Sequence, residues 1–215
     1  MNIKISKYPR GYKQQKNGEF YYAPTTIGVN NAQEFSDFVE NLKEPIAGHL
    51  GYNGNFKGAN GCIGGILKSD NLMHNTTNIV SNQLLMFDYD DTYKCIYEEH
   101  IRRIREKGYN FVAFSSASHE EGRNTVRKKL IVPLENPVEA KFYKEACFTF
   151  LHSLGLENIK DEEDIDAIFH DKTFLQHSHI QFLPTIKSSE WKEKHYKVES
   201  CTTGKYFNYS IHKNL

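Results

Sequence analysis

The sequence lacks the features that would place it in several familiar protein classes. Its 215 residues contain no long apolar run, which argues against a membrane-spanning helix, and we expect no secretory signal at its start. The four cysteines lie far apart and form no C-x-x-C pair, which argues against a zinc ribbon or a disulfide framework. Scattered cysteines are typical of a reducing compartment, so we expect a cytoplasmic protein. The cysteines are Cys62, Cys95, Cys147 and Cys201.

The sequence also has no excess of charge of either sign. The 27 Lys and Arg residues balance 27 Asp and Glu residues, so the formal net charge is zero. This balance disfavours a protein that coats DNA through a basic surface, and any contact with nucleic acid needs a local patch. Aromatic residues make up 13% of the chain, which is a high share. A chain of this length can bury about 70% of its unfolded surface, so its core needs no disulfides or metal ions to be stable.

Hydrophobic periodicity predicts strands alternating with helices, an α/β or α+β arrangement. Gly108 and Gly155 are expected to end two of the helices, and Pro133 to cap a strand. Seven glycines within residues 48–71 predict turns or close backbone approach. The predicted helices are 31–42, 92–109 and 138–155, and the predicted strands are 81–91, 109–119 and 128–134.

The strongest local feature is the acidic end of the strand predicted at 81–91. Because side chains alternate along a strand, Asp88 and Asp90 are expected to share one face while Asp91 points away. Two neighbouring carboxylates repel each other unless a cation lies between them. Hard oxygen ligands of this kind suit Mg²⁺ or Mn²⁺. The alternative interpretation is a solvated strand end at which Asp91 caps the following helix.

A second feature is the small polar turn SSASH at 115–119, which follows an apolar strand. Hydroxyl groups and a histidine at a strand end can bond phosphate oxygens, and the basic residues behind them can neutralise a triphosphate. Alternatively, residues 123–129 form an exposed hairpin whose charges are solvated. The basic residues are Arg123, Arg127, Lys128 and Lys129.

Two further basic segments can be explained without any role in DNA binding. Residues 7–22 interleave basic and aromatic side chains, as a groove that stacks single-stranded DNA does, but an edge strand with exposed tyrosines has the same pattern. Arg102, Arg103 and Arg105 lie on one predicted helix, and we expect them to form a solvated face rather than a DNA site.

Taken together, these pieces resemble the archaeo-eukaryotic primase (AEP) superfamily, and most closely the primase-polymerase domains of plasmids, phages and other mobile elements. In that family an apolar strand ends in DxD or DxE, an SxH-like turn follows, and a basic residue opens an apolar strand ending in Pro-Leu. The similar pieces here are LLMFDYD at 84–90, SSASH at 115–119 and KKLIVPL at 128–134. DKTFLQHSHIQFLPT at 171–185 resembles the family's late segment, with His179 where arginine is expected.

This resemblance, which covers residues 84–185, implies a fold and a function. It implies an α+β fold with an RRM-like sheet flanked by helices, in a single catalytic domain over residues 1–215. The implied parts are an N-terminal αβ subdomain (1–80), the catalytic subdomain (81–186) and a C-terminal tail (187–215). The implied enzyme is a DNA primase or primase-polymerase, a nucleotidyltransferase that copies single-stranded DNA from NTPs or dNTPs during replication of a mobile element. Implied partners are the template, the nucleotides, and a replicative helicase or a separate helical primer-binding module, with no membrane.

The resemblance also implies residue roles. Asp88, Asp90 and a late aspartate would hold two Mg²⁺ or Mn²⁺ ions, which activate a 3′-hydroxyl and take charge from the triphosphate. His119 and Lys129, with Arg127 in support, would bind the triphosphate oxygens, and His119 would count among the catalytic residues. The serine of the SxH turn would be Ser116 or Ser118, because Ala117 stands at its position.

The late aspartate is either Asp171 or Asp166. If this segment is extended, the two residues face opposite sides of the sheet, so that only one can join Asp88 and Asp90. We choose Asp171 because it directly precedes the segment that resembles the family's late motif. Asp166 fits better in the solvated acidic run that begins at Asp161.

Two alternatives from other classes remain. A rolling-circle initiator of the HUH type uses two histidines and a later tyrosine, for which His177, His179 and Tyr209 have the right order. A non-catalytic replication accessory protein would bind nucleotides or single strands without synthesis. A covalent phosphotyrosine adduct would identify the first, and binding without metal-dependent incorporation of nucleotides would identify the second.

Overall fold

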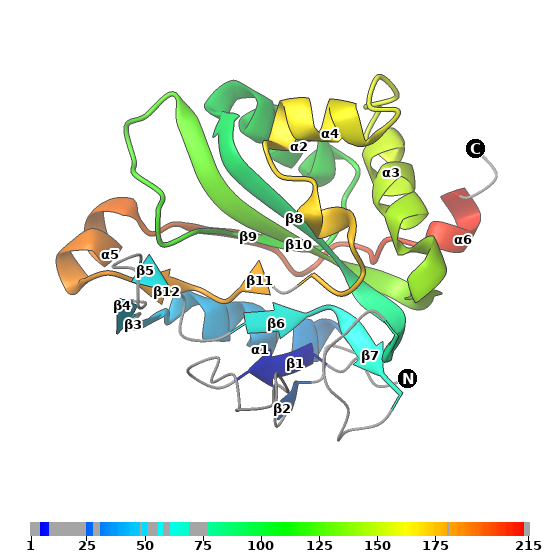
Figure 1. Cartoon of the computed structure of the whole chain (residues 1–215), viewed down its shortest axis with the longest axis horizontal. Helices are drawn as coiled ribbons and strands as arrows, with labels where there is room; N and C mark the ends of the chain where they lie inside the picture. The colour runs from blue at the N-terminus through cyan, green and yellow to red at the C-terminus, as the bar shows by residue number, and fades with distance from the viewer. Residues whose placement is uncertain are drawn as a thin grey trace.

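The central feature of the computed structural model is a five-stranded antiparallel sheet in the order β13-β9-β10-β8-β7 (Figure 1). The structure describes residues 5–8, 25–27, 31–47, 49–50, 56–57, 61–68, 77–179 and 181–212. The strands of this sheet are β7 (Gly65–Leu67), β8 (Ile79–Tyr93), β9 (Phe111–Ser115), β10 (Thr125–Glu139) and β13 (Val198–Cys201). The main helices are α1 (Ala32–Lys43), α2 (Lys94–Glu106), α3 (Tyr143–Ser153), α4 (Glu162–Phe169), α5 (Ser189–His195) and α6 (Tyr209–His212).

Both faces of the sheet are covered, because β8 alternates between two hydrophobic clusters. Phe87 and Tyr89 point into the larger cluster, which α2, α3 and α4 help to form. Leu84 and Met86 point into the other cluster, together with apolar residues of α1 and Trp191 of α5. Figure 1 shows α2, α3 and α4 above the sheet and α1 below it. Helices packed on both faces of an antiparallel sheet confirm the α+β class.

A smaller antiparallel sheet lies on the α1 side, in the order β11-β6-β1-β2. Its strands are β1 (Ile5–Tyr8), β2 (Thr25–Ile27), β6 (Gly61–Ile63) and β11 (Gln181–Phe182). Two short pairs complete the topology: β3 (Ile46–Ala47) with β12 (Thr185–Ile186), and β4 (His49–Leu50) with β5 (Phe56–Lys57). Most of the basic aromatic segment 7–22 and much of the glycine-rich segment 48–71 lie outside the described residues.

Several element boundaries differ from those predicted. Helices α2 and α3 are followed by Gly108 and Gly155, both at positive φ, as the sequence predicts. Strand β10, however, runs through Pro133 as far as Glu139, and α3 begins only at Tyr143. The carbonyl of Pro133 accepts the Phe207 N–H at 3.1 Å, in a place beyond the end of β9. The missing proline N–H therefore faces away from β8, and pairing with β8 resumes at Val138 after an irregularity that follows Pro133.

The strands also run across the predicted subdivision of the chain, which stays a prediction. Strand β7 comes from the segment before residue 80 and β13 from the segment after residue 186, yet both belong to the central sheet. Strand β11, from the predicted catalytic part, pairs with β6 in the smaller sheet. None of the helices in the described part of the chain combines the length and apolar character needed to cross a bilayer.

Candidate metal and nucleotide site

The site begins with an ion pair between neighbouring strands. Asp88 lies on the α1 side of β8, in alternation with Leu84 and Met86, and faces Lys129 of β10 in the strand register. The Lys129 ammonium bonds Asp88 Oδ2, and the two side chains are 9% and 15% exposed. A carboxylate this deeply buried needs a positive partner, and Lys129 supplies it.

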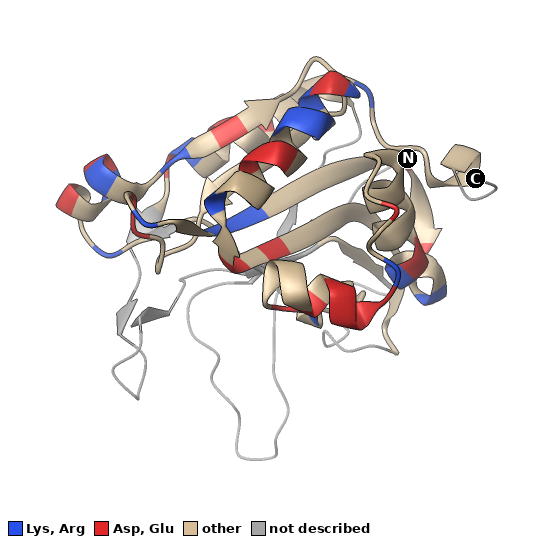
Figure 2. Cartoon of the chain, turned by 90° about the horizontal axis from the view of Figure 1, so that it is seen from above, with Lys and Arg blue, Asp and Glu red and all other residues tan. Residues whose placement is uncertain are grey.

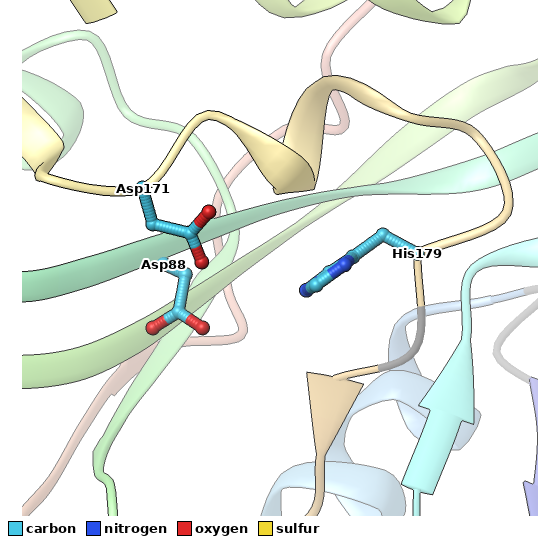
Figure 3. A group of neighbouring side chains, drawn as sticks. All are labelled: Asp88, Asp171 and His179. Atoms are coloured by element: carbon cyan, nitrogen blue, oxygen red, sulfur yellow. The ribbon is translucent and has the colours of Figure 1, made fainter. Parts of the chain in front are cut away.

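Two further side chains converge on Asp88 from a distant part of the sequence. Asp171 follows α4 directly after His170, whose positive φ of 55° turns the chain out of the helix. Ligand atoms of Asp88, Asp171 and His179 all lie within 4.8 Å of one another (Figure 3), and we call these three residues the DDH group. All three are partly shielded from solvent. Figure 3 shows the His179 ring reaching towards the two carboxylates.

The turn that carries Asp171 and His179 is attached to β8. The Thr173 N–H donates to Asp171 Oδ1 at 2.7 Å, which starts the 3₁₀ turn η2 (Thr173–Leu175) and orients the carboxylate. Asn82 on β8 is fully buried, and its Nδ2 donates to the His177 carbonyl at 3.0 Å. The first bond shapes the turn, and the second holds it against the strand that bears Asp88.

The geometry around Asp166 differs from the extended segment considered above. Residues Glu162–Phe169 form helix α4, which Asp161 caps by accepting the N–H groups of Glu163 and Asp164. Asp166 is exposed on this helix, while Asp171 lies beyond its end and next to Asp88. The two aspartates therefore differ because Asp166 lies on a helix and Asp171 in the loop that follows it, and not because they face opposite sides of a strand.

The prediction that Asp91 points away is wrong. Pairing between β8 and β10 shifts register between Val126 and Arg127, so that Asp91 is an extra, bulged residue with a φ of 60°. Its carboxylate consequently reaches the same guanidinium as that of Asp90. Arg127 Nη2 lies 2.6 Å from Asp91 Oδ2, and Arg127 Nε lies 3.1 Å from Asp90 Oδ1. Nor does Asp91 cap α2, whose N-cap is Tyr93.

The pKa values of the two carboxyls are shifted in opposite directions, for different reasons. The hydrogen bond from Arg127 lowers the pKa of Asp91, and the pKa of Arg127 rises in return. Burial raises the pKa of Asp90, which the nearby Asp88 charge reinforces although Arg127 opposes it. Asp90 is thus held by Arg127 and is not part of the DDH group found among the described residues.

The serine-rich turn is close to the same arginine. Arg127 Nη1 donates to Ser118 Oγ at 3.1 Å, and Ser116 Oγ lies 3.2 Å from Ser118 Oγ. The Ser116 N–H in turn donates to the Arg127 carbonyl at 2.9 Å. Two hydroxyls, one guanidinium and two carboxylates therefore form one polar strip that leads towards Lys129 and Asp88.

His119 lies apart from this strip. Its ring is 3% exposed, and Nδ1 accepts the Arg127 N–H at 3.3 Å, so that Nε2 carries the hydrogen and faces Glu121 at 3.4 Å. The ring lines a cavity of about 90 Å³ together with Tyr97 and Lys128, on the α2 side of the sheet. Burial lowers the pKa of His119. Lys129 points to the opposite side, so His119 and Lys129 do not share one pocket.

The arginines of α2 are held by acids. Arg102 pairs with Glu99 and Glu106, and Arg103 also pairs with Glu99. Figure 2 shows basic and acidic residues alternating along this helix. The pattern agrees with the solvated face that the sequence predicts for this segment.

The residues of the rolling-circle alternative are divided between two places. His179 belongs to the DDH group, whereas Tyr209 is 8% exposed on α6 and joins the hydrophobic cluster shared with α3. Figure 1 shows α6 at the end of the molecule beyond α3. A tyrosine that attacks DNA must be accessible, and this one is packed.

His179 is the member of the DDH group that the sequence analysis does not assign to the metal. Its signal is the spacing of eight residues after Asp171 within one polar turn, which becomes meaningful only once that turn is placed beside β8. Asp88 and Asp171 come together as the sequence suggests, and their role as metal ligands stays a prediction.

Comparison with known proteins adds one structural similarity. No family model and no curated protein matches the chain. Among solved structures, the AEP domain of the primase-polymerase (PrimPol) of cyanophage S-2L is similar, with a TM-score of 0.46 and 10% sequence identity. The similarity covers 99% of this chain and 88% of that one.

Proposed function

We propose that this chain is a metal-dependent nucleotidyltransferase that acts as a DNA primase or primase-polymerase on single-stranded DNA during replication of a plasmid, phage or other mobile element. Its substrates are NTPs or dNTPs. The observation that carries the proposal is the convergence of Asp88 and Asp171 beside Lys129. Acids that can hold a cation thus lie next to a base that can bind phosphate, on the segments that resemble primase motifs.

The donor set fits a divalent cation. Asp88 and Asp171 offer carboxylate oxygens that lie within 4.8 Å of each other, close enough to bind one ion together. A bound divalent ion would supply charge stabilisation at the transferred phosphoryl group and lower the pKa of an attacking hydroxyl. The described residues of the DDH group suffice for one such ion, and the second ion implied by the family resemblance would require Asp90.

The bases beside the acids have the role of holding the triphosphate. Lys129 is a compact ammonium next to Asp88, and Arg127 presents a planar fork beside the hydroxyls of Ser116 and Ser118. Phosphate oxygens would replace carboxylates as partners of these two bases. His119 would act indirectly, because its Nδ1 fixes the backbone N–H of Arg127. Positioning and electrostatics supply most of the rate in transfers of this kind.

The test is incorporation of labelled nucleotides on a single-stranded template, with Mg²⁺ and Mn²⁺ in parallel. Asp88→Asn and Asp171→Asn should each lower incorporation by about a hundredfold or more. Asp166→Asn is the matched control, since this acid is exposed on α4, and it should leave the rate unchanged. A wild-type protein that binds nucleotides without incorporating them would instead be a non-catalytic accessory protein. Full activity in Asp88→Asn would remove the DDH group from the reaction.

A further inference from the structure

The donor atoms of the DDH group are of two kinds. Asp88 and Asp171 offer carboxylate oxygens, while His179 offers an imidazole nitrogen that lies within 4.8 Å of one oxygen of each carboxylate. Mg²⁺ prefers an octahedral shell of oxygens and gains little from a nitrogen ligand. Imidazole suits transition metals, and carboxylates suit Mg²⁺, Ca²⁺ and Mn²⁺. A mixed set therefore favours a divalent transition metal that accepts both kinds of donor.

The fold holds His179 where such a ligand is needed. The residue lies between the η2 turn and β11, and its N–H donates to the Gln176 carbonyl at 2.9 Å. The Asn82 side chain attaches the same turn to β8 through the His177 carbonyl. The backbone that carries the ring is thus anchored by its own turn and by the strand that carries Asp88, and Figure 3 shows the ring directed at the two carboxylates.

Asp90, by contrast, lies outside the group of ligand atoms found among the described residues. Its carboxylate lies 3.1 Å from Arg127 Nε, and the same guanidinium is also bound to Asp91 and Ser118. For Asp90 to reach a cation beside Asp88, this contact would have to break. The side chain that completes the set around Asp88 and Asp171 is His179.

We propose that Asp88, Asp171 and His179 are together the ligands of one divalent transition-metal ion, and that His179 makes this site select Mn²⁺ over Mg²⁺. Asp90 is not a ligand of this ion. The inference rests on the proposed function only in placing the ion at the same two carboxylates. It assigns His179 a role in choosing the metal, and its test does not depend on catalysis.

The experiment measures metal binding to the whole chain. Mn²⁺ alone is titrated and followed by electron paramagnetic resonance, with Mg²⁺ as competitor, and electron spin-echo modulation then detects a directly bound imidazole nitrogen. Wild type should bind Mn²⁺ at least about tenfold more tightly than Mg²⁺ and show the nitrogen coupling. His179→Asn should lose the coupling and most of the preference.

Two further variants make the result specific. His177→Asn is the matched control: this histidine is half-buried two residues earlier and lies outside the DDH group, so the coupling and the preference should both persist. His179→Asp replaces nitrogen by oxygen, and should keep a cation site while shifting the preference towards Mg²⁺. A shift of the preference towards Mg²⁺ in His179→Asp excludes a merely structural role for the imidazole, because a structural loss would weaken the binding of both ions alike.

The outcomes separate this inference from the proposed function. No Mn²⁺ binding, equal affinity for the two ions, or a nitrogen coupling that survives in His179→Asn overturns the inference. Nucleotide incorporation by a wild type without nitrogen coupling overturns it too, and leaves the proposed function standing. Nitrogen-coupled Mn²⁺ in a protein that incorporates no nucleotide supports the metal site and overturns the function.

Discussion

Arg127 binds Asp91 through a hydrogen bond of 2.6 Å between Nη2 and Oδ2, although strand alternation would turn Asp91 to the other face of β8. The contact exists because Asp91 is a bulged residue with a φ of 60°, in the left-handed region. Bulges of this kind re-aim side chains, and they recur beside active sites. Here the bulge brings two adjacent carboxylates to one guanidinium, next to the DDH group.

The first prediction tests this bulge. Asparagine adopts a positive φ readily, whereas a β-branched residue does not. Asp91→Val should therefore be less stable than Asp91→Asn by about 1–2 kcal/mol, since both lose the carboxylate and only valine strains the backbone. Urea denaturation of the two variants measures the difference. Equal stabilities would mean that residue 91 does not keep its left-handed conformation.

The second prediction concerns the ion pair of Asp88 and Lys129. Lys129→Met removes the ammonium and leaves a buried carboxylate unpaired, which costs about 3–5 kcal/mol in comparable sites. A divalent cation would replace the lost charge, so Mn²⁺ should raise the melting temperature of Lys129→Met more than that of wild type. Thermal unfolding with and without Mn²⁺ measures this.

Lys128→Met is the control for that prediction. Lys128 is equally buried on the adjacent residue of β10, but it pairs with Glu199 at 2.9 Å on the other face of the sheet. Its loss should lower stability without enlarging the response to Mn²⁺. The same enlarged response in both variants would show that the metal acts elsewhere than at Asp88.

The third prediction concerns nucleotide binding by Arg127. If its guanidinium grips the triphosphate, Arg127→Ala should weaken NTP or dNTP binding about tenfold or more and affect single-stranded DNA less. Arg123→Ala is the matched control, because Arg123 is an exposed arginine of the same hairpin paired with Glu120. Fluorescence titration with each ligand measures both affinities. Equal losses for nucleotide and DNA would place Arg127 in the template groove instead.

Much of the architecture around the site can be predicted from local sequence. The apolar run before Asp88 predicts β8, and the periodic isoleucines with Gly108 predict α2 and its end. Both are strong signals because they depend only on neighbouring residues. The prediction that Pro133 ends the strand is wrong for a non-local reason. The segment around Phe207, far along the sequence, lies along the edge of β10 at which the proline has no N–H to donate.

The site is less predictable for the same reason. The bulge at Asp91 depends on how β8 pairs with β10, and the residues near Asp91 do not predict it. The place of His179 beside Asp88 depends on a hydrogen bond between residues 95 positions apart, from Asn82 to His177. Likewise, the resemblance to primase motifs assigns His119 and Lys129 to one triphosphate site. The sheet nevertheless separates their side chains, because Lys129 points away from α2.

The last prediction is a pH dependence of stability that arises at His100. This histidine is 3% exposed on the buried face of α2, its Nδ1 lies 3.1 Å from the Tyr89 hydroxyl, and burial lowers its pKa from 6.5 to about 4. Between these values the unfolded chain binds a proton that the folded protein does not, so stability falls as the pH falls from about 6.5 towards 4. The full loss should be about 3 kcal/mol. Urea denaturation at several pH values should show this loss in wild type and a smaller one in His100→Gln, which keeps an acceptor for Tyr89 but cannot titrate. Identical pH profiles for the two proteins would assign the acid sensitivity to other groups.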